Sequence, residues 1–220
     1  MRALIFDLDG TLVDTVYAHI FAWQQALAEA GMAIDGWRVH RKIGMSGGLF
    51  TRAVGRELGR QLTIQEVEML QHRHTELYAQ ILPNPRALPG ATELLQFLRN
   101  SRIKHAIATS GERHEIKGSL NALRVPDETL IITRSDVLRA KPEPDLFLAA
   151  QEKMKLSVAE CYVVGDAVWD LLAARRAGML SVGLLSGGYG EDELAKAGAF
   201  RIYRDTEELH QSLDELGVLP

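Results

Sequence analysis

The most constraining feature of this chain is its opening segment, in which a short apolar run leads directly into two aspartates. Residues 3–6 read Ala-Leu-Ile-Phe, which predicts a buried strand, and Asp7 stands where that strand should end. One residue separates Asp7 from Asp9, so an extended backbone would aim both carboxylates to the same side. Gly10 then allows a tight turn, and Thr11 adds a hydroxyl at the same place.

Two carboxylates that converge at the end of a buried strand repel each other, by about 1 kcal/mol at 4 Å in water and by more in a drier cleft. A divalent cation would remove this cost. One carboxylate could then act as a nucleophile while the other transfers protons. An ordinary Asp-Gly turn after an edge strand is the alternative, but residues 3–6 lack the polar alternation of a solvent-facing edge. The segment therefore predicts a metal-assisted catalytic site.

Alternating strand and helix patterns predict a parallel α/β sheet for most of the chain. The β-rich runs are residues 4–6, 105–109, 130–133, 161–164, 181–184 and 200–203. The interval 15–87 breaks the alternation, because it holds three helical segments and no convincing strand. We therefore predict a Rossmann-like core of residues 1–14 and 88–220, with an all-helical cap domain of residues 15–87 inserted after the first strand. The cap would cover the carboxyl ends of the strands, where open α/β sheets bind ligands.

Two further groups of residues follow predicted strands and suit an anionic ligand. Thr109, Ser110 and Gly111 come directly after the strand at 105–108 and offer a hydroxyl and backbone amides. Lys141 precedes Pro142, which should start a helix running from residue 143 to 155. A cation at a helix N-terminus is unfavourable unless something negative shares the place. The alternatives are a threonine with no function, since threonine is common after a strand, and a solvated loop lysine.

A last acidic group follows the strand at 161–164. Asp166 comes after Gly165, at the tip of that strand, and Asp170 lies one helical turn further on. Carboxylate oxygens are the ligands that Mg²⁺ prefers. A helix cap by Asp166 beside a solvated Asp170 is the alternative. Together with the groups above, the sequence places four carboxylates, a hydroxyl and a lysine at strand ends or just beyond them.

These groups match, in order, the four motifs of the haloacid dehalogenase-like (HAD) superfamily, which the chain resembles over nearly its whole length. The motifs read Asp7-Leu-Asp9-Gly-Thr-Leu-Val-Asp14, Thr109-Ser110, Lys141-Pro-Glu-Pro-Asp145 and Gly165-Asp166-Ala-Val-Trp-Asp170. The resemblance implies a Mg²⁺-dependent phosphatase that hydrolyses a small phosphorylated metabolite through an aspartyl-phosphate. It also implies the layout predicted above, with a helical cap inserted after the first motif.

The resemblance also implies a role for each matching residue. Asp7 would be the nucleophile, and Asp9 would protonate the leaving oxygen and later deprotonate water. Asp7, the backbone carbonyl of Asp9, and Asp166 would hold the metal, with Asp170 binding it directly or through water. The remaining residues implied at the phosphoryl group are Thr109, Ser110, Gly111, Lys141 and, at the same mouth, Thr11.

The cap loop at residues 41–48 should contact the leaving group, with Arg41 and Lys42 as candidates for an anionic substrate and Gly44 beside them. Solvated charges are the alternative for both. β-Phosphoglucomutase-like members usually carry an arginine at residues 44–48, and here there is none. We therefore rank phosphatase above phosphomutase, which stays the alternative. Asp9 argues against a dehalogenase and against a phosphonoacetaldehyde hydrolase, although Lys42 leaves the Schiff-base lysine of the latter open.

Bulk properties exclude several other classes. A net charge of −4 over 220 residues argues against a nucleic-acid binder. No apolar run is long enough to span a membrane, and the N-terminus lacks the pattern of a removable signal peptide. The single cysteine, Cys161, cannot form an internal disulfide and fits a reducing compartment. We expect a cytoplasmic protein, either a monomer or a homodimer.

Overall fold

The computed structural model describes residues 2–218, which fold around a parallel six-stranded sheet with strand order β3-β2-β1-β4-β5-β6. This order is typical of Rossmann-like sheets, and all six predicted strands are confirmed. The strands are β1 (Ala3–Phe6), β2 (His105–Ala108), β3 (Ile131–Ile132), β4 (Cys161–Gly165), β5 (Leu180–Leu184) and β6 (Arg201–Tyr203).

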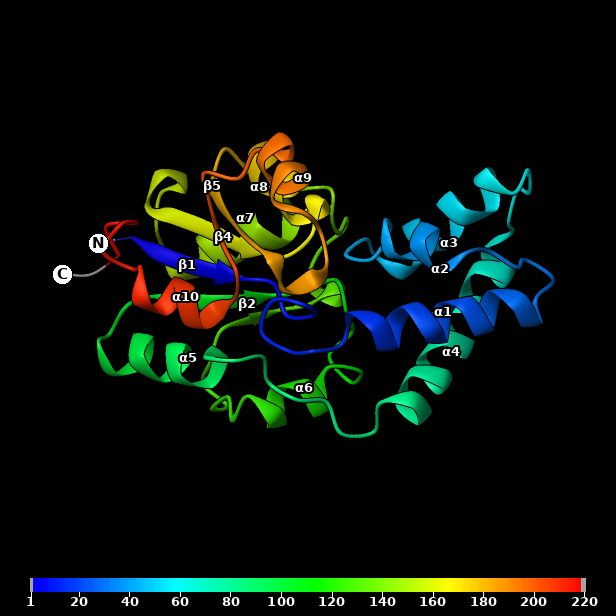
Figure 1. The fold of residues 1–220 in the computed structure, drawn as a ribbon, viewed down its shortest axis with the longest axis horizontal. Helices are drawn as coiled ribbons and strands as arrows, with labels where there is room; N and C mark the ends of the chain where they lie inside the picture. The colour runs from blue at the N-terminus through cyan, green and yellow to red at the C-terminus, as the bar shows by residue number, and fades with distance from the viewer. Residues whose placement is uncertain (1, 219–220) are drawn as a thin grey trace.

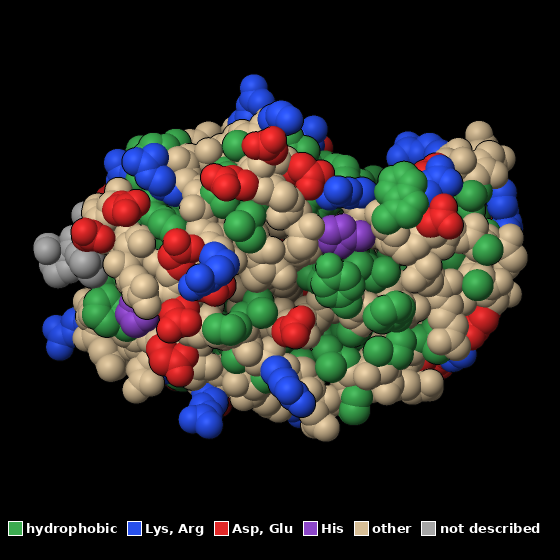
Figure 2. All heavy atoms as spheres, in the orientation of Figure 1, with side chains coloured by type: hydrophobic (Ala, Val, Ile, Leu, Met, Phe, Trp, Pro, Cys, Tyr) green, Lys and Arg blue, Asp and Glu red, His purple; other side chains and the backbone are tan. Residues whose placement is uncertain are grey.

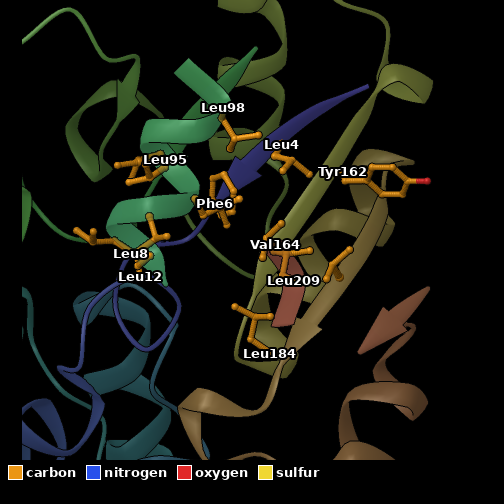
Figure 3. Packing of buried hydrophobic residues seen from close by; sticks show 14 of the residues in the cluster. Leu4, Phe6, Leu8, Leu12, Leu95, Leu98, Tyr162, Val164, Leu184 and Leu209 are labelled. Atoms are coloured by element: carbon orange, nitrogen blue, oxygen red, sulfur yellow. The ribbon is translucent and has the colours of Figure 1, made fainter. Parts of the chain in front are cut away.

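The strands are mostly apolar because helices cover both faces of the sheet, and the exposed Arg201 stands in the edge strand β6. Along β1, Leu4 and Phe6 enter the hydrophobic cluster on one face, whereas Ala3 and Ile5 enter the cluster on the other. This alternation follows from the two-residue period of a strand. Figure 3 shows the first cluster, where Phe6 lies between the leucines of α5 and the side chains of β4 and β5.

The core helices form the two outer layers. One face of the sheet packs against α5 and α10, and the other against α7 and α8. The core helices are α5 (Ala91–Asn100), α6 (Lys117–Ala122), α7 (Asp145–Met154), α8 (Val168–Ala177), α9 (Glu191–Ala197) and α10 (Thr206–Gln211).

The interval between β1 and β2 begins with four helices, which we call the cap. They are α1 (Val16–Glu29), α2 (Gly36–His40), α3 (Gly47–Glu57) and α4 (Ile64–Ile81). The sequence predicted three helices here, because α2 has 5 residues and is too short to show a helical period. The expected capping box of Thr63 and Glu66 at the start of α4 is confirmed. The cap has its own hydrophobic cluster, built around Trp23 and Phe50.

The cap lies at the end of the molecule toward which the β1 arrow points, and both ends of the described chain, near residues 2 and 218, lie at the opposite end (Figure 1). Two neighbouring segments connect it to the core. The amide of Leu88 donates to the carbonyl of Leu12, and the amide of Asp14 donates to the carbonyl of Arg86. An antiparallel bridge joins residues 13 and 87 between them. The chain therefore leaves the core and returns to it at one place.

The surface seen in the orientation of Figure 1 carries both charged and hydrophobic side chains. Acidic and basic side chains are interspersed over the core, and hydrophobic side chains gather over the start of the cap (Figure 2). In that part of the chain, α1 exposes the rings of Tyr17 and Phe21. Within residues 2–218, no helix is both long enough and apolar enough to traverse a lipid bilayer.

Candidate active site

A cavity of about 560 Å³ lies between the carboxyl ends of the strands and the cap. Asp7 follows β1, Thr109 follows β2 and Asp166 follows β4, so three neighbouring strands deliver these side chains to one place. The strand order reverses beside β1, and such a reversal is where open α/β sheets bind ligands. The structure thus assembles at one point residues that are far apart in the sequence.

Three buried carboxylates meet at the base of this cavity. Oxygen atoms of Asp7, Asp166 and Asp170 all lie within 4.8 Å of one another. The Lys141 ammonium lies among them, with Nζ 2.5 Å from Asp7 Oδ1 and 2.8 Å from Asp170 Oδ1. Lys141 does precede a helix, but α7 begins at Asp145 and ends at Met154, so it is shorter at both ends than the sequence indicated.

A hydrogen bond from Thr11 and the close packing of two glycines hold the Asp166 side chain in place. The Thr11 hydroxyl donates a hydrogen bond of 2.7 Å to Asp166 Oδ1. Gly187 and Gly10 pack so closely against Asp166 that a Cβ on either would lie 1.8 Å or 2.5 Å, respectively, from its Oδ2. The amide of Ala167 donates to Asp170 Oδ2 at 3.1 Å. The structure buries Thr11 completely beneath Asp166, outside the cavity wall, so its hydroxyl positions a carboxylate rather than facing the cavity.

Thr11→Val should weaken binding of Mg²⁺ by about tenfold, because a hydrogen bond that orients a metal-binding carboxylate typically contributes about 10–100-fold to metal affinity. The substitution keeps the volume and removes only the donor to Asp166. The measurement is the Mg²⁺ concentration that gives half-maximal activity. Thr129→Val, in a loop remote from the cavity, is the matched control, and an unchanged Mg²⁺ requirement in Thr11→Val would contradict the assigned contact.

Burial and mutual repulsion perturb these carboxyl groups. Burial raises the pKa of Asp7 from an ordinary 3.8 to about 7, with Lys141 opposing and Asp170 adding to the rise. Burial and the charges of Asp170 and Asp7 also raise the pKa of Asp166 well above its usual range. For Lys141, burial would lower the pKa, but Asp170 and Asp7 outweigh it and hold the pKa above its ordinary value. One ammonium thus faces three carboxylates, and this donor set of hard oxygens fits a divalent cation such as Mg²⁺.

These shifts predict that stability depends on pH and metal together. Below about pH 4 the Asp7 carboxyl is protonated in both the folded and the unfolded chain. Between pH 4 and 7 the unfolded chain loses this proton while the folded chain retains it, so the stability of the metal-free protein should fall as pH rises. Mg²⁺ should raise the melting temperature more at pH 8 than at pH 5. Thermal unfolding in EDTA and in MgCl₂ across this range tests it, and an equal effect of Mg²⁺ at both pH values would contradict it.

Asp9 lies apart from the three clustered carboxylates and is contacted by the first cap helix. Thr15 Oγ1 donates to Asp9 Oδ1 at 2.7 Å, and His19 Nε2 lies 3.4 Å from the same oxygen. His19 Nδ1 in turn lies 3.1 Å from Nε2 of the buried His74 on α4. Burial would raise the pKa of Asp9, but the His19 hydrogen bond and charge, together with Thr15, hold it below its ordinary value.

Sequence reasoning missed the two partners of Asp9, Thr15 and His19, and also missed His74, which contacts His19. A signal was present, because Thr15 and His19 are one helical turn apart at the start of α1, and His19 is one turn before the buried Trp23. Of the three, His19 and His74 also line the cavity.

The residues expected around a phosphoryl group border the cavity beside Asp7. Thr109, Ser110, Gly111 and Gly44 all line it. Thr109 Oγ1 accepts a hydrogen bond from the Gly111 amide at 3.0 Å, and Ser110 Oγ donates to the Gly44 carbonyl of the cap at 3.3 Å. Ser110 therefore joins core and cap at the cavity rim.

The two cap cations proposed for an anionic substrate are both engaged with carboxylates. Arg41 pairs with Glu193 of α9 at 2.9 Å and is not part of the cavity lining. Lys42 does line the cavity, but its Nζ lies 2.6 Å from Glu57 Oε2. Arg41 thus joins the cap to the core, and Lys42 is paired within the cap with Glu57, which also pairs with Arg38.

Comparison with known proteins places the chain in a family. Residues 1–178 match the family model described as haloacid dehalogenase-like hydrolase. The chain is 31% identical over 216 residues to β-phosphoglucomutase of Bacillus subtilis, covering 95% of this chain and 92% of that protein. It is 30% identical to phosphoglycolate phosphatase of Rhodospirillum rubrum, covering 100% and 96%.

A crystal structure of a hydrolase from Pseudomonas syringae superimposes with a TM-score of 0.94 at 46% identity, covering 98% of this chain and 99% of that one. The resemblance inferred from the sequence is thereby confirmed. The chain belongs to the haloacid dehalogenase-like hydrolases.

Proposed function

We propose that this enzyme is a Mg²⁺-dependent phosphatase that hydrolyses a small phosphorylated metabolite through an aspartyl-phosphate. The observation that carries the proposal is the position of Asp7, which borders the cavity with one oxygen against the Lys141 ammonium and beside two further carboxylates. An anionic nucleophile can approach a phosphate dianion only where positive charge is concentrated.

The reaction follows from the side chains around the cavity. A carboxylate oxygen of Asp7 attacks phosphorus, and the bond between phosphorus and the leaving oxygen breaks as Asp9 supplies a proton to that oxygen. A water molecule, deprotonated by Asp9, then releases phosphate and restores Asp7. Thr109, the Ser110 amide and Lys141 hold the phosphoryl oxygens.

The lowered pKa of Asp9 keeps its carboxylate ionised in the free protein, which is the form that can accept a proton in the second step. A phosphate dianion bound beside it raises that pKa by charge repulsion and so supports the first step, as an acid. His19 and Thr15 keep the Asp9 carboxylate oriented between the two steps.

Asp7, Asp166 and Asp170, with the backbone carbonyl of Asp9, are the residues that would hold Mg²⁺. When bound, Mg²⁺ neutralises negative charge on the phosphoryl oxygens and on the carboxylates. We also propose that the core of residues 1–14 and 88–220 supplies this chemistry and that the cap of residues 15–87 supplies substrate choice. Residues 1, 219 and 220 lie outside the described range. The setting we propose is the cytoplasm, as a monomer or a homodimer.

A phosphomutase is the second candidate, favoured by the similarity to β-phosphoglucomutase over most of the chain. A mutase must also hold the phosphate that is not being transferred. In the described part of the cavity wall, the cations beyond Lys141 are Lys42 and Arg134, and both are already engaged with oxygen atoms of the protein. Phosphatase therefore ranks first. A mutase would isomerise a hexose phosphate faster than it releases phosphate.

The experiment is phosphate release from p-nitrophenyl phosphate and from a panel of phosphorylated metabolites, in MgCl₂ and in EDTA. We expect hydrolysis that requires Mg²⁺. After rapid acid quenching and proteolysis, mass spectrometry should find one phosphoryl group on the peptide that contains Asp7. Hydrolysis in which no phosphoryl group is found on that peptide would contradict the covalent route.

A further inference from the structure

The cavity wall beyond the phosphoryl site has a chemical character of its own. Beside aromatic rings, the glycines of α3 and the aliphatic side chains of Ile43, Met45, Leu49 and Val137, it has a group of polar side chains from α4 and from the segments after β2 and β3. We call this set the leaving-group wall, and it comprises Gln71, Thr75, Glu112, Glu115, Arg134 and Ser135. We propose that it selects an uncharged polyhydroxy leaving group, a sugar or a polyol, and rejects an acidic one. This inference rests on the proposed phosphatase function and specifies its substrate class.

The two carboxylates of the wall are fixed in place by the protein. Glu115 Oε1 accepts a hydrogen bond of 2.5 Å from Thr75 of the cap, and its Oε2 accepts one of 3.0 Å from the Glu112 amide. Glu112 Oε2 accepts one of 2.6 Å from the Ser135 hydroxyl. Each carboxylate oxygen has a second acceptor site free. The wall therefore presents fixed acceptors that suit hydroxyl groups.

The two cations that line the cavity beyond Lys141 are both held by oxygen atoms of the protein. Lys42 lies 2.6 Å from Glu57 and also donates to a carbonyl of its own segment at 3.1 Å. Arg134 donates to the backbone carbonyls of Val137 at 2.6 Å and Leu138 at 3.2 Å. Glu57 pairs with Lys42 through Oε2 and, through Oε1, with Arg38, which is not among the cavity-lining residues. Within the leaving-group wall itself, the two glutamates outnumber the one arginine. The wall thus carries a net charge of −1, which repels a carboxylate or a second phosphate on the leaving group.

Aromatic rings complete the environment of the leaving group. Trp23 and Phe50 line the same cavity, with their ring centroids 4.4 Å apart. Apolar ring faces beside a few fixed hydrogen-bonding groups are typical of small-molecule sites. A sugar or polyol offers both complementary surfaces, because its C–H groups can lie against the rings while its hydroxyls donate to Glu112 and Glu115.

Matched substrate pairs test the inference on the unmodified enzyme. Glycerol 3-phosphate and 3-phosphoglycerate differ by one alcohol against one carboxylate, as do glucitol 6-phosphate and 6-phosphogluconate. We expect kcat/KM to be at least about tenfold higher for the uncharged member of each pair. Equal values, or a preference for the acid, overturn this inference while leaving the phosphatase proposal in place. Absence of hydrolysis for every phosphomonoester overturns both.

Glu115→Gln should lower the ratio of kcat/KM for the uncharged substrate to kcat/KM for the acid about fivefold. The substitution removes one negative charge while keeping an acceptor for Thr75. Glu68→Gln makes the same change on the exposed face of α4 and should leave the preference unaltered. The ratio of two substrates measured on one preparation does not depend on how much of the protein is folded. A ratio that is the same in Glu115→Gln and in Glu68→Gln overturns the role given to Glu115.

Discussion

Asp7→Asn is expected to lower kcat for phosphate release by about 10⁴-fold or more, because an amide oxygen cannot form the covalent intermediate. The substitution changes neither the volume of the side chain nor its place after β1. Burial and the neighbouring carboxylates raise the pKa of Asp7, so its ionised form destabilises the metal-free fold near neutral pH. The variant should therefore melt at a higher temperature than the parent protein in EDTA at pH 8, while having lost its activity.

Activity and thermal unfolding, measured on the same preparation, separate these two effects. Asp127→Asn makes the same substitution on an exposed loop and should retain full activity. Residual activity of Asp7→Asn above about one per cent of the parent would exclude Asp7 as the nucleophile. A lower melting temperature in EDTA would instead contradict the electrostatic description of the cluster.

Lys141→Met should destabilise the metal-free protein by about 3–5 kcal/mol, because it leaves the buried carboxylates of Asp7 and Asp170 without their ammonium partner. Methionine retains most of the apolar length of lysine, so the effect arises mainly from charge. Saturating Mg²⁺ should recover part of this loss, since the cation supplies positive charge to the same oxygens. We also expect kcat to fall by about 10²–10³-fold through loss of a group that holds the phosphoryl oxygens.

Urea unfolding of Lys141→Met in EDTA and in MgCl₂ measures both parts of this prediction. Lys196→Met, an exposed position in the last turn of α9, is the matched control and should change the free energy of unfolding by less than about 0.5 kcal/mol. If Lys141→Met were no less stable than this control in EDTA, the ion pairs at Lys141 would not compensate the buried charge.

The sheet and the acidic cluster could be predicted because each is encoded locally. An apolar run identifies each strand. In a parallel sheet, the residue that follows each strand must lie at the carboxyl edge of the sheet. Asp7, Thr109 and Asp166 all follow this rule, and Lys141 adds a charge that needs an anion nearby. Thr11 was placed beside the substrate, whereas the turn at Gly10 directs its hydroxyl under Asp166, and no local pattern encodes that direction.

The partners that depend on tertiary packing could not be predicted in this way. Glu115 meets Thr75 only because the cap folds back over the core, and the two residues are 40 positions apart. Arg41 was proposed for substrate because its charge stands in the cap loop, but the fold brings Glu193 of α9 within 2.9 Å of it. The sequence does not predict the helix α2, because a helix of about one and a half turns is too short to show a period of apolar residues.

The paired segments that join cap and core also determine how Asp9 can work. Hydrogen bonds join residues 12–14 to residues 86–88, the two segments that connect cap and core. A rotation of the cap relative to the core would therefore begin beyond these paired segments, at Thr15. Thr15 and His19 belong to the cap side of this connection, whereas Asp9 belongs to the core. Outward rotation of the cap would therefore break both contacts of the Asp9 carboxylate together. Asp9 thus has both of its hydrogen-bonding partners only when the cap stands where this structure places it.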